Sequence, residues 1–197
     1  MILKNVRADF LSIFAARQYK GQGTPKYSVT VIVPRDHPQL NELQAGMVEA
    51  AAAKWGAKAQ ETLAALKAGD RLAVHDGDAK QGREEYKGKL FVNASNDRPF
   101  LILGSGPDGR GPVSETDGKF YNGCRVNIGL SFWAQDNDFG RRINCTLTGI
   151  QFAGDDERIK GGTQLASVDD FEPIANAAPA GAPAGAAPAG SSVSSLF

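Results

Sequence analysis

The sequence contains little cysteine: Cys124 and Cys145 are the only two in 197 residues. Two thiols are too few for a disulfide scaffold or for a zinc site built from four thiolates. Long apolar runs are also missing, and none approaches the roughly 20 residues that a membrane-spanning helix needs. The first residues, MILKNVRADF, lack the apolar segment and small-residue cleavage site of a secretory signal. We therefore expect a protein of a reducing cytoplasm, with no membrane partner.

Histidine is as scarce as cysteine, and this bears on catalysis. His37 and His75 lie far apart, in a spacing that fits neither a metal site nor a catalytic triad. Both cysteines fall in strand-like segments, where a small buried residue is more common than a nucleophile. The GxGxxG pattern at 104–109 is followed by Gly111 and Pro112 rather than by the helix that a dinucleotide site needs. We expect no enzyme activity, no metal and no cofactor.

The sequence also lacks an excess of charge of one sign, because 22 Lys and Arg balance 22 Asp and Glu. A net charge of zero argues against a strong nucleic-acid binder. The distribution is uneven, however: residues 1–153 contain 20 basic and 16 acidic side chains, whereas residues 154–197 contain 2 and 6. The first part is thus mildly basic, at +4, and the end is acidic, at −4. This asymmetry fits an anionic partner, although chance explains it equally well.

Strand-like patterns dominate most of the sequence. Residues 3–14 alternate between apolar and polar side chains, and residues 26–33 are rich in β-branched side chains and stop at Pro34. After Gly69, short strand-like segments are separated by turns rich in Gly, Asp and Asn, as in β-barrels and sandwiches. The strands predicted in this second half are 72–75, 87–95, 100–103, 124–134 and 144–152.

One helical segment interrupts the strands. From residue 40 to residue 67 the composition turns to Ala, Leu, Glu, Gln and Lys, which favour helix. Asp36 is the predicted N-cap, and Gly56 is expected to bend or split the helix. We therefore predict a mainly β fold with an α-helical insertion at 36–68.

The end of the chain differs in composition. From Ala175 to Ser195 it consists almost entirely of Ala, Pro, Gly and Ser. Such a segment cannot bury a hydrophobic core and is predicted to be a disordered, extended tail. We divide the chain into a folded domain at 1–172 and a C-terminal tail at 173–197.

Two predicted strands carry an aromatic residue on a face that is otherwise polar or basic. In 87–95, alternate residues form an apolar face, and Phe91 lies on the opposite face. In 124–134, Trp133 likewise lies opposite the apolar face. Rings among cations and amides suit single-stranded nucleic acid, because bases stack on the rings and cations meet the phosphates. The other residues of these polar faces that we expect to contact nucleic acid are Lys87, Lys89, Asn93, Arg125 and Asn127.

An alternative for the two aromatic residues is structural. Phe91 and Trp133 could instead pack beneath the helical insertion or a loop. Loops supply further candidate contacts to nucleic acid, namely Arg98, Lys119, Tyr121, Arg141 and Arg142.

Several short blocks stand out along the chain. They are KYSVT at 26–30, GKLFVNAS at 88–95, DGKFYNGC at 117–124, FWAQDN at 132–137 and DDF at 169–171. In this order and with comparable gaps, they resemble a family of bacteriophage single-stranded DNA-binding proteins. The resemblance covers most of residues 1–172.

The resemblance implies an OB-fold, which is a Greek-key β-barrel, and binding of single-stranded DNA without sequence preference. It also implies a role in phage DNA replication, recombination and repair, in the cytoplasm of the host cell. Proteins of this class often end in an acidic tail with an aromatic tip, which docks partner enzymes. Phe197 supplies the aromatic tip here, but the acidic residues lie earlier in the chain, at Asp169, Asp170 and Glu172.

Two other functions compete with DNA binding. A structural β-barrel protein of the virion would have no DNA affinity and would form a stable homo-oligomer. A nuclease would need a cluster of carboxylates for divalent metal ions, and the sequence shows no convincing spacing for one. The sequence by itself does not indicate an oligomeric state.

The composition of the tail leads to a first testable prediction. A chain truncated after Ile174 is expected to melt within a few degrees of the full-length protein, because residues 175–197 contribute nothing to the core. Thermal unfolding followed by circular dichroism measures the difference. A large fall in Tm would show that the tail packs on the folded domain.

Overall fold

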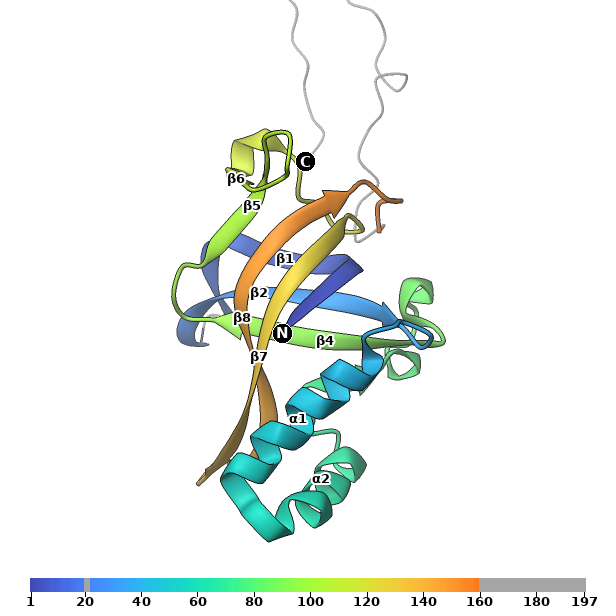
Figure 1. The fold of residues 1–197 in the computed structure, drawn as a ribbon, viewed down its shortest axis with the longest axis vertical. Coiled ribbons are helices and arrows are strands. Elements are labelled where there is room, and N and C mark those ends of the chain that lie inside the picture. The colour runs from blue at the N-terminus through green and yellow to red at the C-terminus, as the bar shows by residue number, and fades with distance from the viewer. Residues whose placement is uncertain (20–21, 160–197) are drawn as a thin grey trace, which may run out of the picture. The chain divides into compact units, whose positions relative to one another are not determined.

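A computed structural model describes residues 1–19 and 22–159 and shows a β-barrel with a helical arm (Figure 1). The barrel strands are β1 (Ile2–Tyr19), β2 (Gln22–Pro34), β4 (Lys89–Asn96), β7 (Arg125–Asn137) and β8 (Gly140–Gly154). Three short strands extend the sheet, namely β3 (Val74–Asp76), β5 (Leu101–Ser105) and β6 (Gly111–Pro112). The predicted tail at 173–197 lies outside the described residues, as do Asp169, Asp170, Glu172 and Phe197.

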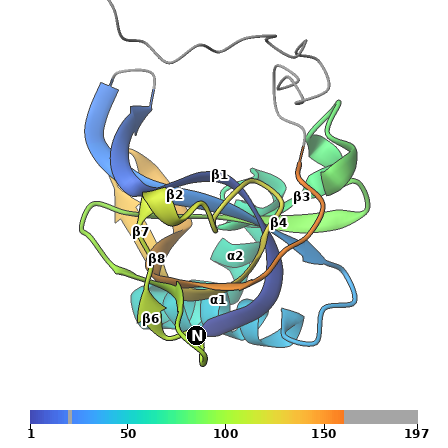
Figure 2. The same ribbon diagram turned by 90° about the horizontal axis from the view of Figure 1, so that it is seen from above.

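A closed ring of strands forms the barrel. The strands follow the order β3-β4-β2-β1-β7-β8-β5-β6, and a further pairing between β4 and β8 closes the ring. Neighbours in the ring are antiparallel except β4 and β8, which are parallel where Ser95 meets Thr146. Seen from above, β1 and β2 project from the barrel as a hairpin (Figure 2). This Greek-key arrangement is that of the OB-fold, so the predicted fold class is confirmed.

Inward-pointing apolar side chains fill the barrel. On β7 these are Val126, Ile128 and Leu130, the apolar face that the alternation predicts. Val31 on β2 pairs with Val92 on β4, and both are fully buried. Both cysteines are also buried in this core, as predicted from the strand pattern.

The predicted helical insertion is confirmed and consists of α1 (Leu40–Trp55), a 3-10 turn (Gly56–Lys58) and α2 (Ala59–Ala68). Gly56 separates the two helices in a left-handed conformation, with φ of 52°, which favours glycine. The N-cap is Gln39 rather than Asp36. The chain first makes a turn in which the His37 N–H donates to the Pro34 carbonyl, and this turn delays the helix. No helix in the described ranges is both long and apolar enough to cross a membrane.

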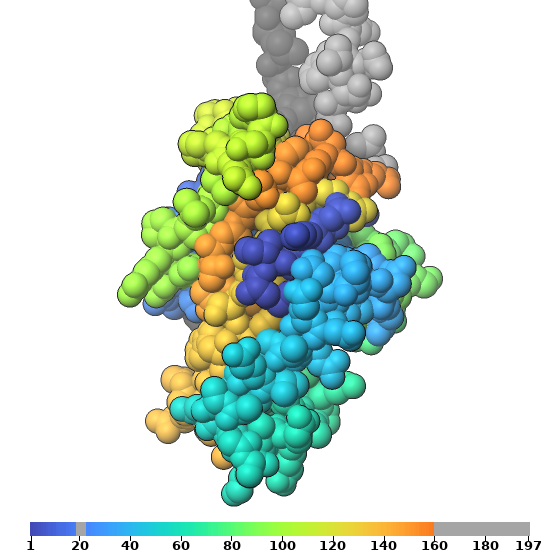
Figure 3. All heavy atoms as spheres, viewed as in Figure 1, coloured from blue at the N-terminus to red at the C-terminus, as the bar shows by residue number. Residues whose placement is uncertain are grey.

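The helical arm, which consists of α1, the 3-10 turn and α2, packs along the β7–β8 hairpin where the hairpin extends beyond the barrel (Figure 3). Close approach of α1 to β7 depends on Gly46, because a Cβ atom there would lie 2.8 Å from Cδ2 of Phe132. Near the end of α1, Trp55 Nε1 donates a hydrogen bond to Asp136 Oδ2 at 2.8 Å. The arm and the hairpin therefore support each other.

The loop at 77–88, between β3 and β4, covers part of the outer face of the barrel. Its Tyr86 is fully buried and donates a hydrogen bond to Asp9 Oδ2 at 2.6 Å. Arg83 forms an ion pair with the same carboxylate at 2.6 Å. Burial raises the pKa of Tyr86, which keeps its hydroxyl protonated as a donor. Asp9 is itself fully buried, so it anchors the loop to β1 through contacts that compensate for its own desolvation.

Replacing Asp9 with alanine is expected to lower the free energy of unfolding by about 3 kcal/mol, because the buried Tyr86 hydroxyl loses its partner. In a domain of this size that corresponds to a Tm lower by roughly 6–12 °C. Asp138→Ala, in the exposed turn between β7 and β8, is the control and should melt like the parent. Equal melting of the two variants would mean that other contacts hold the loop.

Candidate nucleic-acid interface

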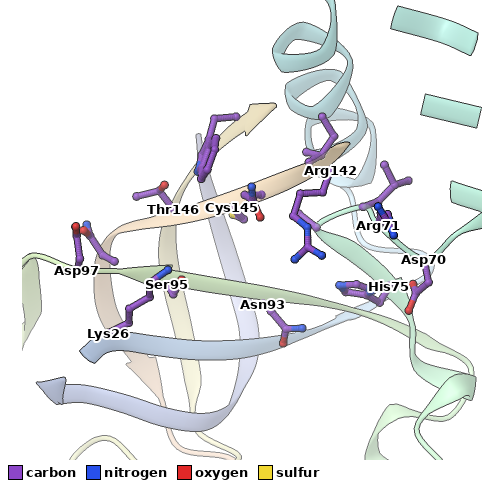
Figure 4. A pocket seen from close by; sticks show the side chains of 16 residues that line it. Lys26, Asp70, Arg71, His75, Asn93, Ser95, Asp97, Arg142, Cys145 and Thr146 are labelled. Carbon is purple, nitrogen blue, oxygen red and sulfur yellow. Dashed lines mark hydrogen bonds and ion pairs between the residues drawn. The ribbon is translucent and has the colours of Figure 1, made fainter. Parts of the chain in front are cut away.

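A cleft of about 430 Å³ opens between the outer face of β4 and the β7–β8 hairpin. Its walls come from segments that are far apart in the sequence: β2, the linker between α2 and β3, β3 itself, β4, and both strands of the hairpin. Side chains from these segments surround the cleft in Figure 4. The lining includes Lys26, Arg71, Asn93, Trp133, Arg142 and Asn144.

The cleft lies where OB-folds bind oligonucleotides. In this fold the ligand contacts the second and third barrel strands, together with the loops that join strands 1 to 2 and 4 to 5. The second and third barrel strands here are β2 and β4, and the fourth and fifth are β7 and β8. Because the lining comes from these strands, the cleft coincides with the general ligand site of the fold.

Trp133 lies in this cleft and is 47% exposed. The alternation of β7 directs it outward, whereas the preceding Phe132 packs against the hydrophobic core. Its partner across the hairpin is Asn144, which lies on the same face. The predicted orientation of Trp133 is therefore confirmed, and its contact with nucleic acid stays a prediction.

Three cationic side chains line the cleft: Lys26, Arg71 and Arg142. Within residues 1–19 and 22–159 none of them forms an ion pair. Arg142 extends from β8 toward β4 (Figure 4). Arg71 is positioned by its own carbonyl, which accepts a hydrogen bond from the Ile143 N–H at 3.1 Å. These cations can therefore meet an anionic ligand without first breaking an ion pair inside the described part of the chain.

Amide and hydroxyl groups also line the cleft, together with the carboxylates of Asp70 and Asp97. Asn93 Oδ1 accepts a hydrogen bond from Thr30 Oγ1 at 2.8 Å, which leaves the amide nitrogen of Asn93 as a donor. Ser95 and Thr146 meet where the barrel closes, and both line the cleft. Such groups bind phosphate and sugar oxygens without carrying sequence information.

Cys145 also lines the cleft, but it is not an activated nucleophile. Burial raises the pKa of its thiol to about 12, so the thiol stays protonated at neutral pH. The cleft therefore offers contacts for binding rather than a reactive thiolate.

Phe91 lies on the predicted face of β4, but the expectation of an exposed ring is wrong, because it is only 7% exposed. The ring of His75 stacks on it at a centroid distance of 4.9 Å, and Tyr86 packs edge-on at 5.5 Å. Lys80 Nζ lies 4.3 Å from its centroid. The loop at 77–88 covers the strand at this point, so Phe91 belongs to a small second core instead of a stacking surface.

Lys87 and Lys89 lie apart from the cleft. β4 begins at Lys89, two residues later than predicted, because Gly88 turns the chain with a left-handed φ of 66°. Lys87 lies in this turn and pairs with Glu84 at 3.8 Å. Lys89 Nζ donates a hydrogen bond to the Glu85 carbonyl at 3.1 Å. Both lysines lie at the end of β4 that the loop covers, so the structure does not bring them to the cleft.

Arg125 and Asn127 lie on the outer face of β7, as predicted, but about 26 and 20 Å along the strand from Trp133. Arg125 Nε donates to Asp156 Oδ2 at 2.5 Å. Asn127 Nδ2 donates to Gln151 Oε1 at 2.9 Å. The prediction that they share one site with Trp133 is therefore wrong, because strand parity specifies a face and not a position along it.

Lys119 and Tyr121 also make contacts within the protein, away from the cleft. Lys119 Nζ donates to the Gly104 carbonyl at 2.7 Å. The Tyr121 hydroxyl donates to Asp155 Oδ1 at 2.9 Å and accepts from the Asp156 N–H at 3.0 Å. These hydrogen bonds thus attach the segment before β7 to β5 and to the residues that follow β8.

The two adjacent arginines of β8 behave differently. Arg142 lines the cleft, whereas Arg141 pairs with Asp136 at 3.1 Å. Neighbouring residues of a strand point to opposite faces, which explains the difference. Arg98 is exposed in the loop after β4, next to Asp97 of the cleft lining.

Two of the three cleft cations, Lys26 and Arg71, are not among the residues that the sequence pattern predicts to contact nucleic acid. Lys26 is the first residue of the predicted strand at 26–33, and a cation at the edge of a strand is a weak indication of a binding residue. Arg71 follows the helical insertion directly, and no local pattern connects it with β8. Its backbone is held by hydrogen bonds to Leu66 and Ile143, and the bond to Ile143 joins it to β8 beside the cleft.

Comparisons with known proteins identify the family. The family described as Enterobacter phage Enc34, ssDNA-binding protein, matches residues 1–181. A curated relative is the putative protein p50 of Acyrthosiphon pisum secondary endosymbiont phage 1. It is 34% identical over 179 residues, which cover 89% of this chain and 94% of the relative.

Solved structures share the fold. The single-stranded DNA-binding protein from bacteriophage Enc34 in complex with ssDNA has a TM-score of 0.67 at 22% identity, covering 81% of this chain and 88% of that chain. The gp2.5 single-stranded DNA-binding protein of bacteriophage T7 has a TM-score of 0.50 at 11% identity, covering 86% and 92%. Because the family match extends over most of the sequence, this chain belongs to the Enterobacter phage Enc34 ssDNA-binding protein family.

Proposed function

We propose that this protein binds single-stranded DNA in the cleft without preference for sequence. The observation that carries the proposal is an exposed Trp133 among three cations at the ligand site of an OB-fold. Membership of the Enc34 family supports the same ligand. A purely structural role in the virion gives no reason for these side chains to gather in one cleft.

Stacking and charge explain why single strands are preferred. Each base stacked on an aromatic ring contributes about 1–3 kcal/mol, and the ring accepts any base. In duplex DNA the bases are already paired and stacked, so they are not available to Trp133. The three cations contact phosphates, which every nucleotide carries. Binding of this kind therefore favours single strands over duplex DNA and tolerates any base sequence.

The biological role that we propose is to cover single strands during phage DNA replication, recombination and repair, in the cytoplasm of the host. This role requires no chemical step from the protein. We also propose that Asp169, Asp170, Glu172 and Phe197 help to dock replication or recombination enzymes, which is what the resemblance of the sequence implies.

Trp133→Ala is expected to weaken binding of a fluorescent oligothymidine about 10- to 100-fold, because the lost stacking is worth 1–3 kcal/mol per base. The Tm should stay nearly unchanged, because about half of the residue is already exposed. Fluorescence anisotropy gives the affinity, and thermal unfolding gives the Tm.

Two control variants separate binding from folding. Leu101→Ala removes a side chain that is 68% exposed and outside the cleft, so it should bind like the parent. Phe91→Ala should instead lose about 3 kcal/mol of stability, because its ring is buried. If Trp133→Ala binds like the parent, the cleft is not the binding site, and if it unfolds, the indole is structural.

The arginine pair provides a second test of the cleft. Arg142→Ala should flatten the plot of log K against log salt by about 0.7, which is the slope of one phosphate contact with single-stranded DNA. Arg141→Ala is the matched control, because it removes the same charge from the neighbouring position but faces Asp136. Titrations at several salt concentrations measure both slopes. The same change of slope in both variants would indicate general electrostatics instead of a contact at Arg142.

A further inference from the structure

Phe10 is displayed on the protein surface by an unusual backbone conformation. Its φ is 50°, a left-handed value that bulky residues rarely adopt. It lies at a bulge, where the pairing of β1 with β2 shifts between Asp9 and Ser12. The residue is nevertheless 50% exposed, so packing in the core does little to offset the energetic cost of this conformation. Bulges re-aim side chains, and strained residues of this kind cluster at binding sites.

Two cations flank the ring of Phe10. Lys80 Nζ lies 5.0 Å from the ring centroid, and the guanidinium carbon of Arg83 lies 4.9 Å from it. Both come from the loop at 77–88. The charge of Arg83 is compensated by its acidic partners, whereas Lys80 forms no ion pair with any residue that the structure describes. Phe10 and Lys80 thus repeat the combination of ring and cation found in the cleft.

A row of serine residues connects the cleft with this site. Ser95 lines the cleft and pairs with Ser28 on β2, which in turn pairs with Ser12 on β1. Paired residues of antiparallel strands point to the same face, so the three hydroxyls form a strip across the outer face. The strip spans two strand spacings, about 10 Å. Its small side chains allow a strand of DNA to lie close to the sheet.

We propose that single-stranded DNA leaves the cleft along this serine strip and that Phe10 is a second stacking platform, with Lys80 contacting a phosphate beside it. The inference rests on the proposed function and extends it. The binding site then crosses β4, β2 and β1, with Trp133 near one end and Phe10 near the other. Along this path the small serine side chains come first, and the ring of Phe10 with the cation of Lys80 follows.

A series of oligonucleotide lengths tests this path. Oligothymidines of about 4 and about 12 nucleotides lie within the range of site sizes of OB-folds. Phe10→Ala should weaken binding of the longer one about tenfold and leave the shorter one unchanged, because the shorter one is held in the cleft. Phe10→Trp keeps an aromatic surface and should bind both like the parent. Lys80→Gln should flatten the salt slope by about 0.7 for the longer oligothymidine only.

Phe10→Gly separates binding from folding. Glycine adopts the left-handed conformation without a steric penalty, so the Tm should be unchanged or raised. The longer oligothymidine should still bind as weakly as it does to Phe10→Ala. A lower Tm in both variants with parental binding of the longer oligothymidine would make Phe10 a structural residue and overturn the proposal.

The outcome also distinguishes this path from the cleft itself. If the Phe10 variants bind both lengths like the parent while Trp133→Ala binds both weakly, the extended path is wrong and the cleft remains the binding site. If Trp133→Ala also binds like the parent, the proposed function of the cleft fails as well. If Phe10→Ala lost the same affinity for both oligothymidines, the assignment of Trp133 as the first platform and Phe10 as the second would be wrong.

Discussion

The parallel pairing of β4 with β8 is the interaction on which the candidate site depends. It closes the barrel where Ser95 meets Thr146, and the cleft lies along this seam. Without this pairing and the neighbouring hydrogen bond from Asn96 Nδ2 to the Leu147 carbonyl, β4 would lose its direct connections to β8 at this seam. Asn93 would then be separated from Arg142, although neither side chain would be altered. The cleft is therefore a consequence of barrel closure, because its walls belong to different parts of the chain.

The helical arm makes the same surface larger. The β7–β8 hairpin extends beyond the barrel, where isolated pairs of strands are only marginally stable. Packing of α1 at Gly46 and the hydrogen bond from Trp55 to Asp136 support the hairpin there. The chain then returns to the barrel past β8 and places Arg71 in the cleft. The insertion thus contributes to the site, since it supports the strand that carries Trp133 and leads into the linker that supplies Arg71.

The loop at 77–88 decides which aromatic residues of the outer face are accessible. Its anchor is the buried carboxylate of Asp9, which binds Tyr86 and Arg83. The same loop covers Phe91 and places Lys80 beside Phe10. One ring is thereby removed from the surface, while another remains displayed at the bulge of β1. A loop outside the barrel strands consequently determines how far a surface suited to nucleic acid extends beyond the cleft.

Alternation of side chains in the sequence determined the faces of the strands, because strand side chains repeat every two residues. It placed Val126, Ile128 and Leu130 in the core and Trp133 outside, and composition located the helical insertion. Separated sequence blocks also indicated the OB-fold and the family. Only the tertiary structure decided which outward residues lie together and uncovered. Phe91 and Trp133 have the same pattern, yet a loop covers one of them. The alternation of side chains specifies which face of the sheet a residue points to. It does not specify where along the strand the residue lies relative to another one, or which segment packs over it.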